Sequence, residues 1–529
     1  MTELINVFKL QNVIDINFEN YTQKLYFEDI ERYGLENVWL SIIKANINNS
    51  ISEDSIVHYK NFGLLYEFGL AFINKKDKQK AGAYYTPVDV ANVLSDFLLD
   101  LEGENICDVA CGTGNLILSV LNKLGKEKAY DLLTNNKIYL YDNDALALLI
   151  CCHTIAIIYG EEIFDNIQCY NDNFLKNTIK IPQNSKVISN PPYFKIDDIT
   201  DNVDLSEIAI QSKELYAAFM EKIIKNSVSS VIITPYSFLH GSKFSKLRIF
   251  LNNYSGYFFS FDNVPGNIFN GVKIGTLSSS NRNSVRTTIS VINNSDEKGF
   301  RTTQLIRFHN SEREKMLTKK FLLSLLSNKK QIIDNENLIF CKQFKNLESV
   351  YTCWKNKSNG TLRDLTNQNS SYVIYMPHAC RYFTCGVTYA MNRAMRDVIY
   401  AKDEKSFYYL YVMLNSSFAY WYGRMFDGGI NFSSNLALNM PCFINEISDE
   451  KYAEIKKIVD AAILNEQKYI VKKLNAGKYQ ENIKFPISYR RSFDEILIDV
   501  LDLKVDIKEF DVPYSKTILK VSGVVESEE

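Results

Sequence analysis

The sequence predicts an α/β fold, in which a mainly parallel sheet follows a helical N-terminal region and precedes a second domain. Between residues 81 and about 310, short β-branched or aromatic segments alternate with longer helical patterns, which is typical of α/β sheets. Three successive strand-like segments of this region end in aspartate, and a Gly-x-Gly turn and a helix follow the first of them. That order is the first βα unit of a nucleotide-binding sheet.

The first βα unit has Asp108 at the end of its strand, then the turn from Gly112 to Gly114, then an apolar helix over residues 116–124. The two glycines allow the backbone to approach a ligand closely. A dinucleotide fingerprint would need a third glycine, where this chain has Ile117. The acid before the glycines suits a cationic, methionine-like ligand better than a pyrophosphate.

The next two predicted strands also end in acidic residues. Residues 138–141 lead into Asp142, at the position where ribose hydroxyls are usually held in such sheets. Residues 166–170 lead into Asp172 and Phe174, which could bind an adenine amino group and cover its ring. Any one of these carboxylates could instead cap a helix. Three acids at three successive strand ends favour a ligand site.

A fourth strand, over residues 186–189, runs directly into Asn190, Pro191, Pro192 and Tyr193. This tetrapeptide suits the methylation of a planar amino group, because the nitrogen must become pyramidal before it can attack a methyl sulfonium. The Asn190 amide oxygen and the Pro191 carbonyl could each accept one N–H, and two prolines stiffen the loop. Tyr193 offers a flat face to an extruded base. A structural Pro-Pro turn is the alternative.

These features together resemble the amino-group methyltransferases that use S-adenosylmethionine, and most closely the gamma-ordered DNA adenine-N6 enzymes of restriction–modification systems. Residues 82–87, about twenty residues before the first strand, resemble the family motif that contacts the methionine carboxylate, and their upstream position defines the gamma order. The resemblance covers roughly residues 60–300 and implies a Rossmann-like class I methyltransferase sheet. At residues 109–110 the chain has Val-Ala where Pro-Ala is frequent, which removes no ligand.

The resemblance also implies roles for individual residues. Thr86 would bind the methionine carboxylate, and Asp142 would hold the ribose. The aromatic residue of loop 265–269 would cover the target base on the side opposite Tyr193. The implied cofactor-binding set is Tyr85, Thr86, Asp108, Ala110, Gly112, Gly114, Asp142, Asp172, Phe174 and Asn190, and the implied catalytic set is Asn190, Pro191, Tyr193 and Phe269. No metal is expected.

Later segments fit the same fold. Residues 231–235 match the fifth strand and residues 244–251 the helix after it, while residues 257–261 and 286–292 would supply the late antiparallel pairing of the family. From about residue 311 the pattern becomes aromatic, rich in Asn and Ser, and irregular, and it turns helical over residues 452–475. We therefore expect a helical region over 1–80, a catalytic domain over 81–310 and a DNA target-recognition domain with C-terminal helices over 311–529.

The predicted recognition domain has a local excess of basic residues. Residues 351–400 contain two acids, with aromatic residues interleaved, and six basic residues: Lys355, Lys357, Arg363, Arg381, Arg393 and Arg396. Arginine, aromatic and amide side chains suit phosphate and base-edge contacts. An ordinary core with a solvated face is the alternative. Residues 414–417 and 428–431 resemble a recurring signature of target-recognition domains, in which the glycines form a loop near the DNA.

Composition limits the function classes. The chain has 529 residues, a net charge of −2, and 46% apolar residues without a long uncharged apolar run, so no membrane span is expected. The acidic start predicts no secretory signal. Ten cysteines without metal-binding spacing and five dispersed histidines indicate free thiols in a reducing cytoplasm. DNA binding requires a local basic face, and the net charge does not exclude it.

We therefore predict a site-specific DNA methyltransferase that transfers a methyl group from S-adenosylmethionine to the N6 amino group of a flipped adenine in double-stranded DNA. It would be the modification enzyme of a restriction–modification system, with a cognate restriction endonuclease as a possible partner and no physical partner required. Two alternatives remain: a protein glutamine-N5 methyltransferase, which would share Asn-Pro-Pro-Tyr, and a non-catalytic DNA-specificity subunit. Methylation of cytosine N4 would more often place Ser at position 190.

Overall fold

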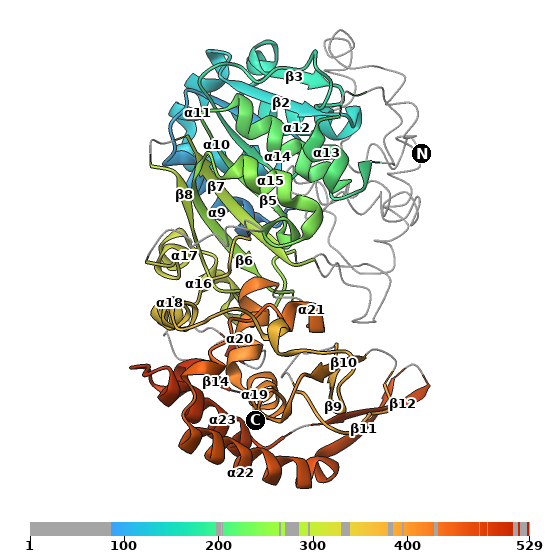
Figure 1. Ribbon diagram of the computed structural model, residues 1–529. Helices are drawn as coiled ribbons and strands as arrows, with labels where there is room; N and C mark the ends of the chain where they lie inside the picture. The colour runs from blue at the N-terminus through green and yellow to red at the C-terminus, as the bar shows by residue number, and fades with distance from the viewer. Residues whose placement is uncertain are drawn as a thin grey trace. The chain divides into compact units, whose positions relative to one another are not determined.

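Five parallel strands form the centre of the computed structural model, as the alternation of strands and helices predicted (Figure 1). The structure describes residues 86–196, 203, 205–263, 266–269, 285–294, 297–328, 339–378, 385–393, 396–427, 432–475, 477–483, 485–511, 517–518 and 526–527. The predicted helical region over 1–80, Tyr85, and the glycine loop at 428–431 lie outside these ranges. The chain divides into two units: residues up to 301 with 309–324 and 330–339, and residues 302–308, 325–329 and 340–529.

The sheet of the first unit has the strand order β3-β2-β1-β4-β5-β7-β6-β8. The strands from β3 to β5 run parallel, and β7 lies between β5 and β6, antiparallel to both. The predicted α/β sheet, mainly parallel and with a late antiparallel pairing, is therefore confirmed. The strands are β1 (Asn105–Asp108), β2 (Ile138–Asp142), β3 (Gln168–Asn171), β4 (Ser185–Ser189), β5 (Ser229–Pro235), β6 (Ser255–Phe261), β7 (Thr287–Asn293) and β8 (Gly299–Thr302).

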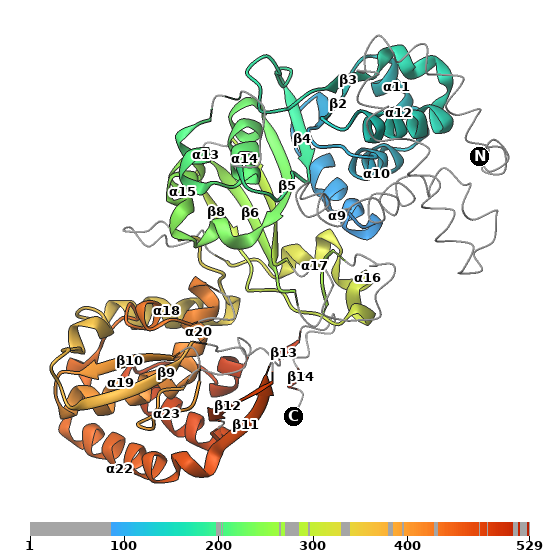
Figure 2. The same cartoon turned by 90° about the vertical axis from the view of Figure 1, so that its right-hand side faces the viewer.

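Helices cover both faces of this sheet (Figure 2). Helices α9 and α10 pack together and against β4 on one face, while α13, α14 and α15 form a group on the other. Because both faces are covered, most residues of the inner strands β1, β4 and β5 are buried, with apolar residues such as Val187 and Val231 at their centres. The helices of this unit are α9 (Val88–Leu99), α10 (Asn115–Leu124), α11 (Lys126–Thr134), α12 (Ala145–Tyr159), α13 (Glu207–Ser212), α14 (Leu215–Asn226), α15 (Ser245–Leu251), α16 (Arg313–Met316) and α17 (Lys319–Ser324).

The third strand begins later than predicted. Residues 161–166 form a 3₁₀ helix, and β3 covers only Gln168–Asn171. The side chain of Asn166 donates to the carbonyl oxygen of Thr134 at 2.9 Å, which fixes it in the turn before the strand. Side-chain hydrogen bonds of asparagine to backbone compete with strand pairing in this way.

The second unit is more regular than its sequence pattern indicated. Its aromatic residues form a core in which Trp354 and Trp421 are buried beside Phe418. The elements are α18 (Glu348–Asn356), β9 (Tyr372–Pro377), β10 (Arg396–Ala401), α19 (Glu404–Asn415), α20 (Ser417–Phe426), α21 (Ser434–Ala437), α22 (Asp449–Asn465), β11 (Ile470–Asn475), β12 (Lys478–Ile483), α23 (Ile487–Val500), β13 (Thr517–Ile518) and β14 (Glu526–Ser527). Strands β9 and β10 pair antiparallel.

The helix predicted over residues 452–475 is wrong in its second half. Helix α22 ends at Asn465, and β11 pairs with β12 as an antiparallel hairpin. Gly477, with φ of +78°, lies at the turn, where a left-handed conformation favours glycine. The β-branched pair Ile470 and Val471 at the start of β11 favours a strand.

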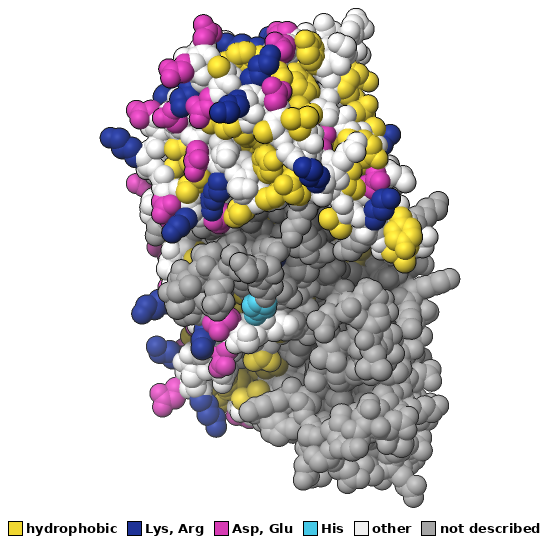
Figure 3. All heavy atoms as spheres, turned by 90° about the horizontal axis from the view of Figure 1, so that it is seen from below, with side chains coloured by type: hydrophobic (Ala, Val, Ile, Leu, Met, Phe, Trp, Pro, Cys, Tyr) yellow, Lys and Arg dark blue, Asp and Glu magenta, His cyan; other side chains and the backbone are white. Residues whose placement is uncertain are grey.

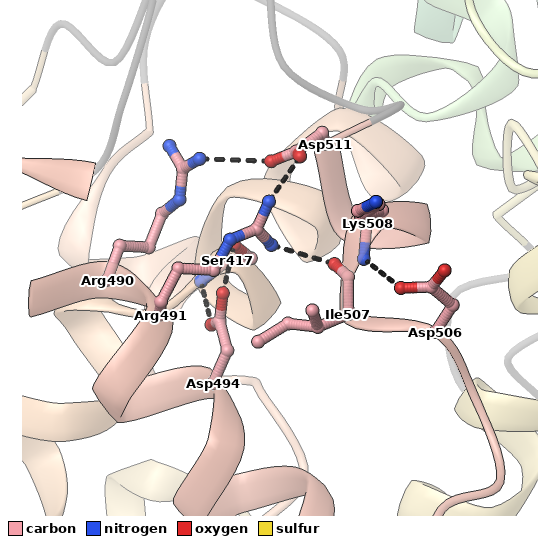
Figure 4. Close-up of polar contacts among 8 residues, drawn as sticks. All are labelled: Ser417, Arg490, Arg491, Asp494, Asp506, Ile507, Lys508 and Asp511. Atoms are coloured by element: carbon pink, nitrogen blue, oxygen red, sulfur yellow. Dashed lines mark hydrogen bonds and ion pairs between the residues drawn. The ribbon is translucent and has the colours of Figure 1, made fainter. Parts of the chain in front are cut away.

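A buried carboxylate connects two helices of the second unit (Figure 4). Asp494 of α23 accepts the backbone N–H of Ser417 at 2.7 Å and the Ser417 hydroxyl at 2.6 Å. It therefore caps the N-terminus of α20 from another helix. Nearby, Arg490 and Arg491 both bind the carboxylate of Asp511, so their charges are paired inside this unit.

The described surface carries both charge signs. In the view of Figure 3, Lys and Arg side chains are interspersed with Asp and Glu. Charge therefore does not single out the described part of this face as a nucleic-acid surface. Within the described ranges, every helix is too short or too polar to span a bilayer.

Candidate active site

The carboxyl ends of β1, β2 and β4 bring the predicted residues to one edge of the sheet. Strand β1 lies between the other two, and Asp108 is in register with Leu140 of β2 and Ile188 of β4. Because these strands are parallel, the residues that follow them meet at the same edge. The strand-end acids Asp108 and Asp142 and the tetrapeptide beginning at Asn190 therefore share one region, at the kind of site where α/β sheets bind ligands.

The glycine turn is held directly by the second acid. The backbone N–H of Gly112 donates to one oxygen of Asp142 at 2.7 Å, and the N–H of Asp144 donates to the other at 2.9 Å. Gly112 has φ of +51°, with open space where a Cβ would lie. Gly114 has φ of +94°, and a Cβ there would lie 2.5 Å from the sulfur of Cys151. Glycine is thus required at both positions for backbone geometry.

Asp108 is a fully buried acid. Its side chain is 0% exposed, and neither of its oxygens makes a hydrogen bond to the described part of the chain. Burial raises the pKa of Asp108 to about 8, and the charge of Asp142 adds to the rise. Burial likewise raises the pKa of Asp142 to about 7, with Asp144 contributing. A buried acid such as Asp108 fits a cationic ligand, because a nearby positive charge stabilises its ionised form.

The third acid is already engaged. Asp172 binds Lys176 at 2.5 Å and accepts the backbone N–H of Asn173 at 2.7 Å. Phe174 is only 3% exposed and packs in the core against Tyr141, with ring centroids 5.8 Å apart. These contacts tie both residues to their own loop and core, so Asp108 and Asp142 fit a ligand better than Asp172 and Phe174 do.

Lys222 is a residue of this region that sequence reasoning missed. Its ammonium group donates to the carbonyl oxygens of Phe174 at 2.5 Å and Lys176 at 2.8 Å, so it fixes the loop after β3. Burial lowers its pKa to about 8. The residue lies within the ordinary helical pattern of α14, which gave no signal of this contact.

Asn190 connects the tetrapeptide after β4 with the upstream motif that contains Thr86. Its amide nitrogen donates to the hydroxyl of Thr86 at 3.0 Å, and its amide oxygen accepts from the hydroxyl of Tyr193 at 2.7 Å. The Tyr193 hydroxyl also lies 2.9 Å from the carbonyl oxygen of Ile233 on β5. The amide plane of Asn190 is therefore fixed from both ends.

The two predicted stacking rings lie in contact. The centroids of Tyr193 and Phe269 are 6.1 Å apart with planes at 65°, an edge-to-face arrangement, and Phe269 is 3% exposed. A base stacked between two parallel rings needs roughly 7 Å between them, because carbon atoms pack about 3.5 Å apart. Tyr216, which the sequence did not single out, packs edge-on against Tyr193 at 6.2 Å. The structure thus brings the rings together, and a stacked base would require Phe269 to move.

Comparisons with known proteins agree with this architecture. The model of the N-6 DNA Methylase family matches residues 57–344. The chain is 30% identical over 133 residues to the methylase subunit of the type I restriction enzyme MjaIX from Methanocaldococcus jannaschii, covering 25% of this chain and 22% of that protein. It is 24% identical over 237 residues to the EcoEI methylase subunit from Escherichia coli, covering 43% and 47%. The chain thus matches less than half the length of these relatives.

Solved structures show a weaker likeness. The type IIG restriction endonuclease BpuSI is 11% identical, with a TM-score of 0.39, and the match covers 85% of this chain and 69% of that one. The M protein of the type I restriction enzyme EcoKI is 12% identical, with a TM-score of 0.32, covering 53% and 61%.

Proposed function

The chain belongs to the N-6 DNA methylase family, and from this premise we propose that it is a DNA adenine-N6 methyltransferase. Its substrate would be an adenine in double-stranded DNA and its methyl donor S-adenosylmethionine. We further propose that it serves a restriction–modification system, as the names of its relatives indicate for those proteins. Site specificity and a cognate endonuclease are parts of the same proposal.

The fixed orientation of Asn190 is the observation that supports this chemistry. Its amide oxygen accepts the Tyr193 hydroxyl, and because an amide oxygen has two lone pairs the same atom can also accept an N–H of a substrate. Thr86 accepts from the amide nitrogen, so the amide cannot rotate without breaking this bond. An acceptor aimed at the amino group lowers the cost of making its nitrogen pyramidal, because it stabilises the charge that develops there.

The other residues would position the base and exclude water. The carbonyl oxygen of Pro191 would accept the second amino hydrogen, and Tyr193 would stack on one face of the base. Phe269 would cover the opposite face after the loop moves. No tuned general base is needed, because the proton leaves only after the nitrogen has become cationic.

The cofactor would be held by the glycine turn and the two acids Asp108 and Asp142. S-adenosylmethionine, when bound, supplies an electrophilic methyl group on a sulfonium. Asp142 would bind the ribose hydroxyls while it holds the N–H of Gly112. Asp108 would supply negative charge near the methionine moiety, and Thr86 would contact its carboxylate. The orphaned oxygens of Asp108 are the structural observation that fits this cation.

The second unit is the proposed DNA-recognition part. Arg393 binds the neutral side chain of Asn482, and Arg396 binds the carbonyl oxygen of Met391. Neither arginine forms an ion pair with a described acid, so both charges remain available for phosphates. Arg363 likewise binds neutral residues of the same unit, Asn435 and Asn439. Arg381 lies outside the described residues.

Methylation of DNA in cells tests the proposal. The chain is expressed in a host that lacks adenine methylation, and its DNA is read by single-molecule sequencing. We expect N6-methyladenine at one sequence motif. Asn190→Ala should lower transfer by about 100-fold or more, as loss of a group aimed at a transition state does. Asn226→Ala, which removes an exposed amide that donates to Lys222 O, is the matched control.

The outcomes separate the proposal from its alternatives. Unmodified DNA with methylated protein glutamine would identify a protein methyltransferase. Unmodified DNA with tight cofactor-free DNA binding would identify a specificity subunit. Full transfer by Asn190→Ala would remove Asn190 from the chemistry.

A further inference from the structure

A single guanidinium group joins the loop of Phe269 to the helix that follows Thr86. Arg313 of α16 is 8% exposed and forms an ion pair with Asp89, using Nε and Nη2 for the two carboxylate oxygens. The same guanidinium donates to the carbonyl oxygens of Asn267 at 2.5 Å and Ile268 at 2.6 Å. It thus binds a carboxylate and two loop carbonyls at once.

Both partners of Arg313 lie next to the proposed site. Asp89 is in the first turn of α9, which begins two residues after Thr86. On the other side, the side-chain oxygen of Asn267 accepts the backbone N–H of Phe269 at 3.0 Å. The two residues before Phe269 are therefore held by Arg313 and by this turn.

These contacts form a closed chain that joins the residues proposed to hold the target base. Asn190 binds Thr86 and Tyr193, and Tyr193 contacts Phe269. The backbone from Thr86 to Asp89 and the guanidinium of Arg313 complete the connection back to the Phe269 loop. Every member belongs to the first unit.

We propose that Arg313 is a positioning residue that sets Phe269 relative to Asn190 and Thr86 for methyl transfer. The inference rests on the proposed function and adds a residue to it. Arg313 acts through Phe269. Its hydrogen bonds to the carbonyl oxygens of Asn267 and Ile268 fix the position that the Phe269 loop takes up again after the base has entered. Asp89 holds the guanidinium in place and ties that position to the start of α9.

The chemistry requires arginine. A guanidinium presents five N–H donors in a rigid plane, so it can serve a carboxylate and two carbonyls simultaneously. A lysine keeps the charge and can pair with Asp89, but its single ammonium cannot reproduce the planar fork. Arg313→Lys therefore removes loop positioning while it leaves the charge, and Asp89→Asn removes the charge while it leaves a similar shape.

Steady-state kinetics on the full chain test the role. With DNA carrying the motif found by sequencing, Arg313→Lys and Asp89→Asn should each lower kcat by about 10- to 100-fold, as misplacement of a reacting group does. The Kd for S-adenosylmethionine should stay within about twofold of the wild-type value, because Arg313 holds no proposed cofactor ligand. Lys319→Met is the matched control, since it breaks a second ion pair to α9, with Asp100 at the far end of the helix.

A double variant separates positioning from general stability. If Arg313 acts through Phe269, then Arg313→Lys should have little further effect on kcat in a Phe269→Ala background. Additive losses, or equal losses from Lys319→Met, would show that Arg313 only stabilises the fold and would overturn the inference. Wild-type kcat in both Arg313→Lys and Asp89→Asn would also overturn it. Absence of transfer by the wild-type chain would instead refute the proposed function.

Discussion

The Tyr193 hydroxyl lies 2.7 Å from the amide oxygen of Asn190 and 2.9 Å from the carbonyl oxygen of Ile233. A hydroxyl has one hydrogen, so it donates to one of these acceptors at a time. Tyr193 therefore offers more than a flat face: its hydroxyl orients the amide that is proposed to bind the target amino group. Sequence reasoning assigned a role to the ring alone.

Removal of this hydroxyl should have a measurable cost. We expect Tyr193→Phe to lower kcat by roughly fivefold, since a hydrogen bond of this kind contributes about 1 kcal/mol. Tyr193→Ala should cost about 1–3 kcal/mol more through lost stacking. Methyl-transfer rates at saturating DNA and cofactor measure both. Equal rates for Tyr193→Phe and wild type would show that Thr86 alone orients Asn190.

The buried Asp108 and the half-buried Asp142 predict how cofactor affinity depends on pH. The pKa of Asp108 is raised to about 8 and that of Asp142 to about 7, mainly by burial, so both are largely protonated at lower pH in the free protein. A cationic ligand favours the ionised forms, and binding should release protons. Affinity for S-adenosylmethionine should therefore rise from pH 6 to pH 8.

Asp142→Asn tests the contribution of one of these acids. Calorimetry at several pH values should show weaker binding and a shallower rise with pH than in the wild type. The titration of the ligand itself is common to both proteins and cancels in the comparison. An unchanged affinity would mean that Asp142 serves only the glycine turn, whose Gly112 N–H it accepts.

The arginines of the second unit should set DNA affinity. Arg393→Ala or Arg396→Ala should weaken DNA binding without changing cofactor affinity, and each lost phosphate contact should lower the salt-dependence slope by about one. DNA-binding titrations over a range of salt measure this. Arg490→Ala is the matched control, because Arg490 is paired with Asp511. A slope reduced equally by all three substitutions would contradict specific phosphate contacts.

The cap on α20 predicts a stability effect in the second unit. Asp494→Ala should lower the free energy of unfolding by about 1–3 kcal/mol, because it leaves the buried N–H and hydroxyl of Ser417 without an acceptor. Asp499→Ala removes an exposed acid from the same helix, paired with Lys451, and should cost less than about 1 kcal/mol. Chemical denaturation provides both values. A similar cost for the two variants would argue against the cap.

Local sequence predicted the sheet and the strand-end residues well. The aspartates after β1 and β2, the Gly112 turn and the tetrapeptide after β4 could all be located, because strand periodicity and turn chemistry are short-range properties. The hairpin of β11 and β12 could not, since the pattern before it is helical up to Asn465 and its pairing depends on a partner strand. The helices α19 and α20 were also not predicted, because their sequences are rich in aromatic residues and do not show a clear helical pattern.

Tertiary structure alone decided which groups face each other in the site. The sequence separates Asp89 from Arg313 by 224 residues and Thr86 from Asn190 by 104, and neither spacing carries a signal. It likewise gave no sign that Asp172 would pair with Lys176 or that Phe174 would be buried in the core. The sequence by itself determined the residues that follow each parallel strand, because backbone pattern fixes where a strand ends. Their partners were decided only by the fold, because hydrogen bonds and ion pairs depend on distances that chain closure sets between distant segments.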